Sequence, residues 1–228
     1  MIIITGASRG IGKFLLSKFI NKPFDNKLIG LYNKTEPDSY QEYMQQVDIT
    51  KLDEINAFVT KNTNELNNLI LINCAGSNYN AFGHKADPKK WAELINVNLI
   101  GTFNMINAIL PVMRNQNYGR IINISSVVAQ KGVPGTSAYA ASKSGLWGMS
   151  KSLAVENASK GITINNLNLG YFQIGMIDKV PGEMQEKIKS NIPVNDFGNP
   201  IEIYKSVKYL IDNEYITGSS IDVNGGLY

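Results

Sequence analysis

The chain has 228 residues and a mass of 25.2 kDa, with 43% hydrophobic and 18% charged residues. This is the balance of a globular protein, and the length suits one large domain or two small ones that fold without metal or disulfide. The net charge of +3 is too small to favour nucleic-acid binding. One cysteine, Cys74, and one histidine, His84, exclude an intrachain disulfide and a Cys/His zinc cluster.

Two further features of the composition bear on function. No uninterrupted apolar run approaches the ~18 residues of a membrane span, and the first residues carry no basic leader, so we expect a cytoplasmic protein that binds no membrane. Asparagine occurs 27 times, whereas arginine occurs only at Arg9, Arg114 and Arg120. An isolated asparagine is therefore weak evidence for a functional role, and an arginine in a special place is stronger evidence.

Short apolar runs alternate with amphipathic stretches along the chain. In order, we predict strand 2–5, helix 11–20, strand 27–32, strand 45–48, helix 52–60, strand 69–73, helix 88–113, strand 119–125, helix 137–158, strand 162–167, a loop with a short helix, helix 201–211 and strand 219–223. Such alternation indicates a parallel sheet covered on both faces. We expect one doubly wound, Rossmann-type α/β domain over residues 1–228, with seven parallel strands and helices on both faces.

The first predicted strand passes into the first predicted helix through a glycine-rich turn. Glycines let a pyrophosphate approach the backbone, and the free N–H groups of a helix N-terminus favour an anion. The spacing is Gly-x-x-x-Gly-x-Gly, and no Gly-Lys-Ser/Thr follows, which excludes a P-loop. A tight turn without a ligand is the alternative, but its strand–turn–helix context favours nucleotide binding by Gly6, Ala7, Ser8, Arg9, Gly10, Ile11 and Gly12.

The residues after the second predicted strand bear on the choice of cofactor. A site selective for NAD usually places an Asp or Glu there, but this chain has Asn33 and Lys34, with no acid before Glu36. Arg9 and Lys34 could balance a 2′-phosphate, which predicts NADP and makes NAD the weaker choice. Alternatively, Lys34 is a solvated surface charge.

A carboxylate ends the third predicted strand, at Asp48-Ile49. Asp48 could accept a hydrogen bond from an adenine amine. It could also cap the following helix, and the two roles are compatible.

Tyr139 and Lys143 are one helical turn apart on the same face of a predicted helix. A tyrosine pKa of about 10 is too high for a general base at neutral pH, and nearby cations such as a lysine and a nicotinamide lower it. A Tyr acid/base suits a chain with one histidine, although such a pair is common on any helix. Ser125 and Ser126 end the fifth predicted strand, where ligands bind in such sheets; they could hydrogen-bond a carbonyl or cap the next segment.

These motifs occur in a characteristic order over nearly the whole chain. They are Thr-Gly-Ala-Ser-Arg-Gly-Ile-Gly at 5–12, Asn73-Cys74-Ala75-Gly76, Asn96-Val97-Asn98, Ser126, Tyr139-x-x-x-Lys143, Ile216-Thr217-Gly218 and Val223-Asn224-Gly225-Gly226. The ordered set resembles the short-chain dehydrogenase/reductase family, and among its subgroups the 3-oxoacyl-(acyl-carrier-protein) reductases most.

The resemblance implies an NADP(H)-dependent enzyme that interconverts a carbonyl and a secondary alcohol by hydride transfer. Tyr139 would protonate the carbonyl oxygen on reduction, Lys143 would hold the nicotinamide ribose, Ser126 would orient the substrate oxygen and Asn98 would hold a proton-relaying water. It also implies a homodimer or homotetramer, a small-molecule substrate and no metal. Cofactor contacts are expected from the glycine-rich turn and from Asn33, Lys34, Asp48, Ile49, Cys74, Ala75, Gly76, Tyr139, Lys143, Gly170 and Phe172.

The chain departs from the family pattern near the nicotinamide. Cys74 replaces the second Asn of Asn-Asn-Ala-Gly, Leu169 replaces a Pro, and Ile174 replaces a Thr four residues past Gly170. We expect weaker nicotinamide anchoring, because two side-chain contacts are lost. These changes motivate the alternative of an NADP-binding sensor or scaffold with little catalysis.

The substrate pocket should be built from the loops 77–86, 127–137 and 171–198. The last loop carries apolar residues and is expected to form a mobile lid over the site: Phe172, Met176, Ile177, Val180 and Met184. The sequence does not identify the substrate, so acyl thioesters, sugars, steroids and small ketones all stay candidates.

Overall fold

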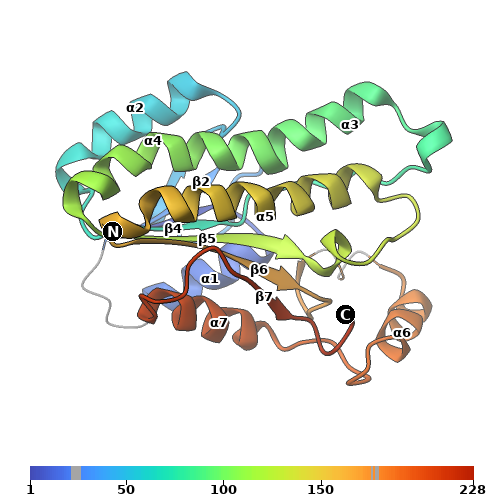
Figure 1. The fold of residues 1–228 in the computed structure, drawn as a ribbon. Helices are drawn as coiled ribbons and strands as arrows, with labels where there is room; N and C mark the ends of the chain where they lie inside the picture. Colours follow the sequence, from blue (N-terminus) through green and yellow to red (C-terminus); the bar gives the residue numbers. More distant parts are fainter. Residues whose placement is uncertain (22–26, 176, 178–179) are drawn as a thin grey trace.

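A computed structural model describes residues 1–21, 27–175, 177 and 180–228; Met176 of the predicted lid lies outside them. In this part of the chain, seven parallel strands form one sheet, as predicted (Figure 1). Their order in the sheet is β3-β2-β1-β4-β5-β6-β7. The strands are β1 (Ile2–Thr5), β2 (Leu28–Tyr32), β3 (Met44–Gln46), β4 (Ile70–Asn73), β5 (Gly119–Ser126), β6 (Ile162–Leu169) and β7 (Ser220–Val223).

Helices cover both faces of the sheet, which confirms the predicted α/β layering (Figure 1). Helices α2, α4 and α5 cover one face, and α1 and α7 cover the other. Between β2 and β3, the structure shows one helical element, the short turn η1 (Gln41–Tyr43). The helices are α1 (Gly10–Ile20), α2 (Leu52–Asn62), α3 (Pro88–Ile95), α4 (Gly101–Gln116), α5 (Ser137–Asn157), α6 (Gly182–Ser190) and α7 (Pro200–Asp212).

Strands β1 and β4 are almost wholly apolar, as expected for strands whose two faces are both buried. Successive side chains of a strand point to opposite faces, so Ile3 joins the core under α2 and α4, whereas Ile4 joins the core under α1 and α7. Because the seven strands are parallel, their carboxyl ends meet at one edge of the sheet. The predicted motifs lie at that edge, except for Ile216-Thr217-Gly218, which precedes β7 and lies at the opposite edge.

The predicted helix 88–113 is a longer, modified helix. Pro88 occupies its first turn, the Asp87 side chain caps it by accepting from the Lys89 amide at 2.8 Å, and the π-helical turn η4 (Asn96–Ile100) joins α3 to α4. The stretch Pro88–Gln116 has an 18-residue window with a mean hydropathy of 1.3, enough by length and composition to cross a membrane. The search for uninterrupted apolar runs does not detect this helix, because polar residues interrupt it. Its residues Met105, Ile106 and Ile109 pack in the core against the sheet, as expected for a core helix.

The helix-capping alternative for Asp48 is wrong. Strand β3 ends at Gln46, and Lys51 is the N-cap of α2, without a side-chain hydrogen bond. Asp48 instead accepts from the Thr50 amide at 3.0 Å and from its hydroxyl at 2.7 Å. The carboxylate closes a local turn because Thr50 offers two donors nearer than the first turn of the helix does.

Candidate active site

The glycine-rich turn packs tightly against the end of β4. Gly6 and Gly10 have φ angles of +67° and +54°, and a Cβ on Gly6 would lie 2.6 Å from the Ala75 Cα atom. A Cβ on Gly12 would collide with the Gly6 carbonyl oxygen. The Thr5 hydroxyl accepts from the Ala75 amide at 3.0 Å. The chain therefore needs glycine here to bring this turn and residues 74–76 together.

The first turn of α1 leaves its amide groups available to a ligand. Arg9 is the N-cap residue, with extended backbone and no side-chain cap hydrogen bond, so the N–H groups that begin the helix have no capping side chain. Arg9, Asn33 and Lys34 are all exposed, and neither cation forms an ion pair with a described residue. The turn presents a positive helix end and two free cations, a combination suited to phosphate groups.

Three predicted catalytic side chains lie together at the end of β5. Tyr139 and Lys143 lie one turn apart on α5, with the Lys143 Nζ atom 5.7 Å from the centre of the Tyr139 ring. The Tyr139 and Ser126 side chains are hydrogen-bonded. Ser126 also accepts from the Val128 amide at 3.3 Å, so it caps the short turn η5 (Val127–Ala129) as well.

Burial dominates the electrostatics of this cluster. It raises the pKa of Tyr139 to about 12, against a smaller lowering by the Ser126 hydrogen bond. It also lowers the pKa of Lys143 to about 8, against a small raising effect of Cys74. The sequence argument expected cations to lower the Tyr139 pKa. In the protein alone, desolvation is the larger effect, and Tyr139 stays protonated at neutral pH.

Asn98 lies in the π-helical turn η4 and is fully buried. Its Oδ1 atom accepts from the Ser77 amide at 2.8 Å, and its Nδ2 atom donates to the Ser77 carbonyl and the Ser142 hydroxyl. A Cβ on Gly76 would lie 3.3 Å from Asn98 Oδ1 and 3.9 Å from Lys143 Nζ. The missing side chain of Gly76 thus leaves space that both groups border. π-turns of this kind are frequent at functional sites.

Two of the other predicted cofactor residues, Asp48 and Ile49, follow strand β3. Burial is the largest single effect on the Asp48 pKa, and it raises that pKa. Hydrogen bonds from Thr50 and Asn33 together outweigh burial, so the pKa of Asp48 lies below its usual value. Ile49 is buried, and its carbonyl accepts from Asn104 at 3.1 Å, so its side chain is part of the core.

Near the nicotinamide end of the predicted site, Cys74 and Phe172 pack into the apolar core. Burial raises the pKa of the Cys74 thiol to about 12, with Lys143 lowering it in part. Phe172 is buried and pairs with Gly198, and Ile174 packs against the same core. Gly170 is required by a close approach, because a Cβ there would lie 2.7 Å from the Asn224 Cα atom.

The three predicted substrate loops converge at this edge of the sheet. The Ala81 amide donates to the Gly135 carbonyl at 2.8 Å, which joins loops 77–86 and 127–137. A Cβ on Gly10 would lie 3.5 Å from the Gly175 Cα atom, so the third loop reaches the glycine-rich turn. A cavity of about 190 Å³ lies beneath the third loop, against Val223, Asn224 and Gly225. His84 is exposed and stacks with Phe82.

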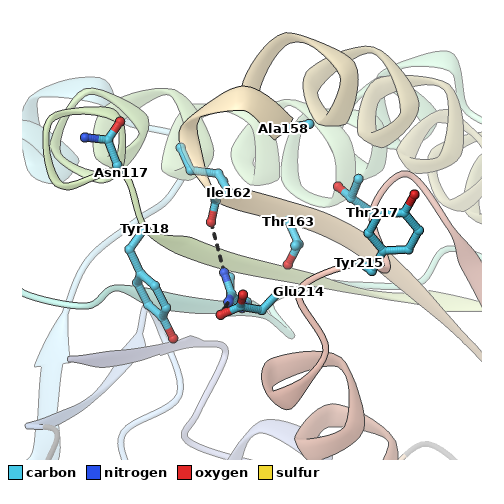
Figure 2. A pocket seen from close by; sticks show the side chains of 10 residues that line it. Asn117, Tyr118, Ala158, Ile162, Thr163, Glu214, Tyr215 and Thr217 are labelled. Atoms are coloured by element: carbon cyan, nitrogen blue, oxygen red, sulfur yellow. Dashed lines mark hydrogen bonds and ion pairs between the residues drawn. The ribbon is translucent and has the colours of Figure 1, made fainter.

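A larger cavity, of about 510 Å³, lies at the amino ends of β5 and β6 (Figure 2). Tyr118, Glu214 and Tyr215 surround it, and Arg120 lies in its wall. Arg120 is six residues before Ser126 on an extended strand, so this cavity is roughly 20 Å from the predicted catalytic cluster. None of the predicted site residues lines it.

Sequence reasoning missed two side chains that touch the cluster. Ser142 binds Asn98, and Trp147 donates its indole Nε1–H to Ser125 and Asn168 at 3.1 and 2.9 Å. Ser142 occupies a variable position of Tyr139-x-x-x-Lys143, and Trp147 lies outside the motifs. Only the packing of α5 against the strands brings them into contact with the site.

Comparisons with known proteins agree with this geometry. A family model described as short chain dehydrogenase matches residues 1–185. The 3-oxoacyl-[acyl-carrier-protein] reductase FabG of Staphylococcus aureus is 32% identical over 238 aligned positions, which cover 99% of this chain and 97% of that protein. The acetoacetyl-CoA reductase of Rhizobium meliloti is 43% identical over 162 positions, covering 70% and 67%. The chain therefore belongs to the short-chain dehydrogenase family, as an oxidoreductase that uses a nicotinamide cofactor and acts on CH–OH or carbonyl groups.

Proposed function

We propose that this protein is an NADP(H)-dependent reductase that converts a carbonyl to a secondary alcohol. The observation that carries the proposal is the cluster of Ser126, Tyr139 and Lys143 beside the glycine-rich turn, with Tyr139 held protonated. Tyr139 is protonated at neutral pH, which is the form that reduction requires. Burial also makes it a weaker proton donor, so the positive charges of Lys143 and of a bound nicotinamide must lower its pKa for efficient transfer.

The residues present fit a dinucleotide. Gly6 and Gly12 let the turn pack closely against residues 74–76 and against itself, because a Cβ on either would collide with backbone. At Gly10 a Cβ would meet only the Gly175 Cα atom within 4 Å, and the start of α1 offers amide donors to a pyrophosphate. Arg9 and Lys34 supply positive charge for a 2′-phosphate, and no acid stands at 33–35 to bind a free ribose hydroxyl. These features favour NADP over NAD. The bound cofactor supplies the hydride, and the protein supplies position and protons.

The proton is handled by the chain's own residues. Tyr139 donates its hydroxyl proton to the substrate oxygen, and the Ser126 hydroxyl, already bonded to Tyr139, holds that oxygen in line. The Lys143 Nζ atom donates to the Ile124 carbonyl at 2.7 Å, which fixes the ammonium beneath the site. The space bordered by Asn98, Gly76 and Lys143 suits a relay water, because it offers polar partners on two sides.

For the substrate class, we propose a 3-oxoacyl thioester. Both kinds of relative named above reduce such a group by name, and two exposed apolar residues of loop 171–198, Met184 and Val194, suit an acyl chain. We further propose a cytoplasmic homodimer or homotetramer whose substrate selectivity resides in the three loops rather than in a second domain. Exposed apolar residues on α4 and α5, such as Phe103 and Val155, support self-association.

The test is NADPH oxidation with acetoacetyl-CoA, followed by sugar, steroid and small-ketone panels. Tyr139→Phe should lower kcat about a thousandfold while the NADPH dissociation constant, measured by fluorescence, changes less than about threefold. Tyr209→Phe, an exposed tyrosine on α7, is the matched control and should keep full turnover.

Three outcomes would each contradict one part of this proposal. Saturable NADPH binding without turnover on any panel favours the sensor or scaffold suggested by Cys74 and Ile174. Normal turnover by Tyr139→Phe would refute the mechanism. A lower dissociation constant for NADH than for NADPH would refute the cofactor assignment.

A further inference from the structure

Polar side chains form two rows across the face of the sheet that α5 covers. Strand register aligns Asn73, Asn123, Asn166 and Ser220 in one row, and Ser125, Asn168 and Asp222 in the next. Side-chain hydrogen bonds of 2.8–3.4 Å join neighbours within the first row: Asn73 to Asn123, Asn123 to Asn166, and Asn166 to Ser220. In the second row, Asn168 donates to Asp222 at 2.8 Å.

Helix α5 is hydrogen-bonded to both rows. Its Ser150 hydroxyl donates to Asn166 and accepts from Asn123 in the first row. Its Trp147 indole N–H contacts Asn168 and Ser125 in the second row. Four of the seven buried residues of α5 are polar or charged, so this helix is seated on the sheet by directed hydrogen bonds as well as by packing.

The second row ends at the catalytic cluster. The Ser125 hydroxyl donates to the Lys143 carbonyl at 3.2 Å while it accepts from Trp147. Ser125 precedes Ser126 on β5, and Lys143 follows Tyr139 by one turn of α5. Trp147 and Ser125 therefore join the strand that carries Ser126 to the helix that carries Tyr139 and Lys143.

The far end of the row reaches a wall of the predicted pocket. Asp222 accepts from the Gln130 side chain at 3.0 and 3.2 Å, and Gln130 follows η5 in the loop 127–137. The row thus runs from edge strand β7 to the cluster and holds the loop that begins at Ser126.

A polar interface of this kind restricts movement more than an apolar one. Apolar side chains re-pack after a small slide, whereas a buried hydrogen bond weakens steeply once its donor is misaligned, and an unpaired buried partner is costly. Hydrogen-bonded networks therefore favour one arrangement of the elements they join. Asn73 Oδ1 and Gln130 Oε1, at the outer ends of the two rows, have no hydrogen-bond partner in the described part of the chain, whereas the bonds that Trp147 and Ser150 make to the rows are all formed.

We propose that Trp147 is a positioning residue that, through Asn168 and Ser125, fixes the position of α5 along the sheet and with it the geometry of Ser126, Tyr139 and Lys143. The proposal rests on the proposed function for its kinetic readout. It assigns a role to side chains that contact neither substrate nor cofactor.

The experiment compares Trp147→Phe with a destabilised control. Trp147→Phe keeps an aromatic ring and removes only the indole donor. Asn157→Ala removes buried hydrogen bonds to Arg114 and Leu153 at the far end of α5, roughly 15 Å along the helix. Both variants should lower the melting temperature. Only Trp147→Phe should lower kcat, by about tenfold, with KM for NADPH within about twofold, because misplacement acts on the reacting geometry.

A double variant separates position from stability. Trp147→Phe leaves the Asn168 Oδ1 atom without its indole donor, and adding Asn168→Leu removes that unpaired group, which should recover part of the melting temperature. The proposal expects kcat to stay low in the double variant. Recovery of kcat together with stability, or an equal loss of kcat in Asn157→Ala, would overturn it.

A second readout does not depend on turnover. In protein labelled with ¹³C at the lysine ε-carbon, the Lys143 signal is identified by its loss in Lys143→Met and should titrate near pH 8. Trp147→Phe should move this pKa upward toward the ordinary value of about 10.4 as the helix shifts and water enters, and Asn157→Ala should not. If the wild type reduces no substrate, the proposed function fails. The titration then decides the positioning role alone, and an unchanged Lys143 signal overturns it.

Discussion

Two buried cations lie near opposite ends of β5, and their surroundings differ. Arg120, near the amino end, is 3% exposed and donates to the Ile211, Gly119 and Gly161 carbonyls and to Glu214. Its guanidinium lies 4.5 Å from the centre of the Tyr118 ring. Lys143, which lies against the carboxyl end, is 6% exposed and donates to the Ile124 carbonyl. Among the described residues, it forms no ion pair.

This difference separates a structural cation from a functional one. A buried charge is tolerated when hydrogen bonds and an opposite charge compensate for lost hydration, and Arg120 has both. Lys143 lacks the opposite charge, so its pKa falls to about 8. Uncompensated groups of this kind concentrate at sites that receive a ligand. The larger cavity therefore borders a structural arginine whose charge is compensated by hydrogen bonds and by Glu214. The candidate active site is the carboxyl end of β5, where the buried Lys143 has no opposite charge among the described residues.

Of the two buried cations, Lys143 should give the larger effect on activity when it is replaced by methionine. We expect kcat to fall at least a hundredfold, while the free energy of unfolding at pH 7 rises by up to about 3 kcal/mol, since 1 pKa unit is about 1.4 kcal/mol. Turnover assays and urea unfolding measure the two effects. Such opposite signs are typical of functional residues.

The gain in stability should depend on pH in a defined direction. The folded pKa of Lys143, about 8, lies below its unfolded value of 10.5, so the folded state binds fewer protons. The destabilisation is fully present below pH 8 and disappears as pH rises to about 10.5. Unfolding of the wild type and Lys143→Met at pH 7 and 10.5 checks this, and a gain that persists at pH 10.5 would contradict it.

Arg120→Met should show the reverse behaviour. The substitution leaves three backbone carbonyls without their hydrogen-bond donor. We therefore expect a loss of about 2–4 kcal/mol of stability, with kcat per folded molecule within about twofold of the wild type. Glu214→Gln is the control, because Glu214 is 83% exposed and such pairs contribute under about 1 kcal/mol. A loss of kcat as large as in Lys143→Met would remove the distinction between the two ends.

The exposed cations at the carboxyl edge should have a smaller, selective effect. Lys34→Glu places a carboxylate where NAD-selective sites have one, so we expect KM for NADPH to rise about tenfold and KM for NADH to fall. Lys61→Glu, an exposed residue on α2, makes the same charge change away from the site. If both variants change KM for NADPH equally, the effect is one of net charge and the role of Lys34 is refuted.

The sequence predicted what depends on local pattern. Apolar runs and helical periodicity located the strands and the layering, and Tyr139 and Lys143 could be paired because four residues make one helical turn. The two rows of polar residues could not be predicted, because they depend on strand register between β4, β5, β6 and β7. The 27 asparagines made any single one uninformative. Likewise, Arg120 and Lys143 differ only in partners that are distant in the chain.

The smallest effect should come from Cys74, which sharpens the comparison of the two cations. Its thiol is the group whose ionised form could pair with Lys143 as Glu214 pairs with Arg120, but burial raises its pKa to about 12. We therefore expect native Cys74 to be alkylated by iodoacetamide at pH 8 roughly a thousandfold more slowly than free cysteine, and Cys74→Ala to change kcat less than about threefold. Unfolding in urea should restore the reaction. Rapid alkylation of the native protein would mean that a thiolate already neutralises Lys143, and the two ends of β5 would then hold equivalent ion pairs.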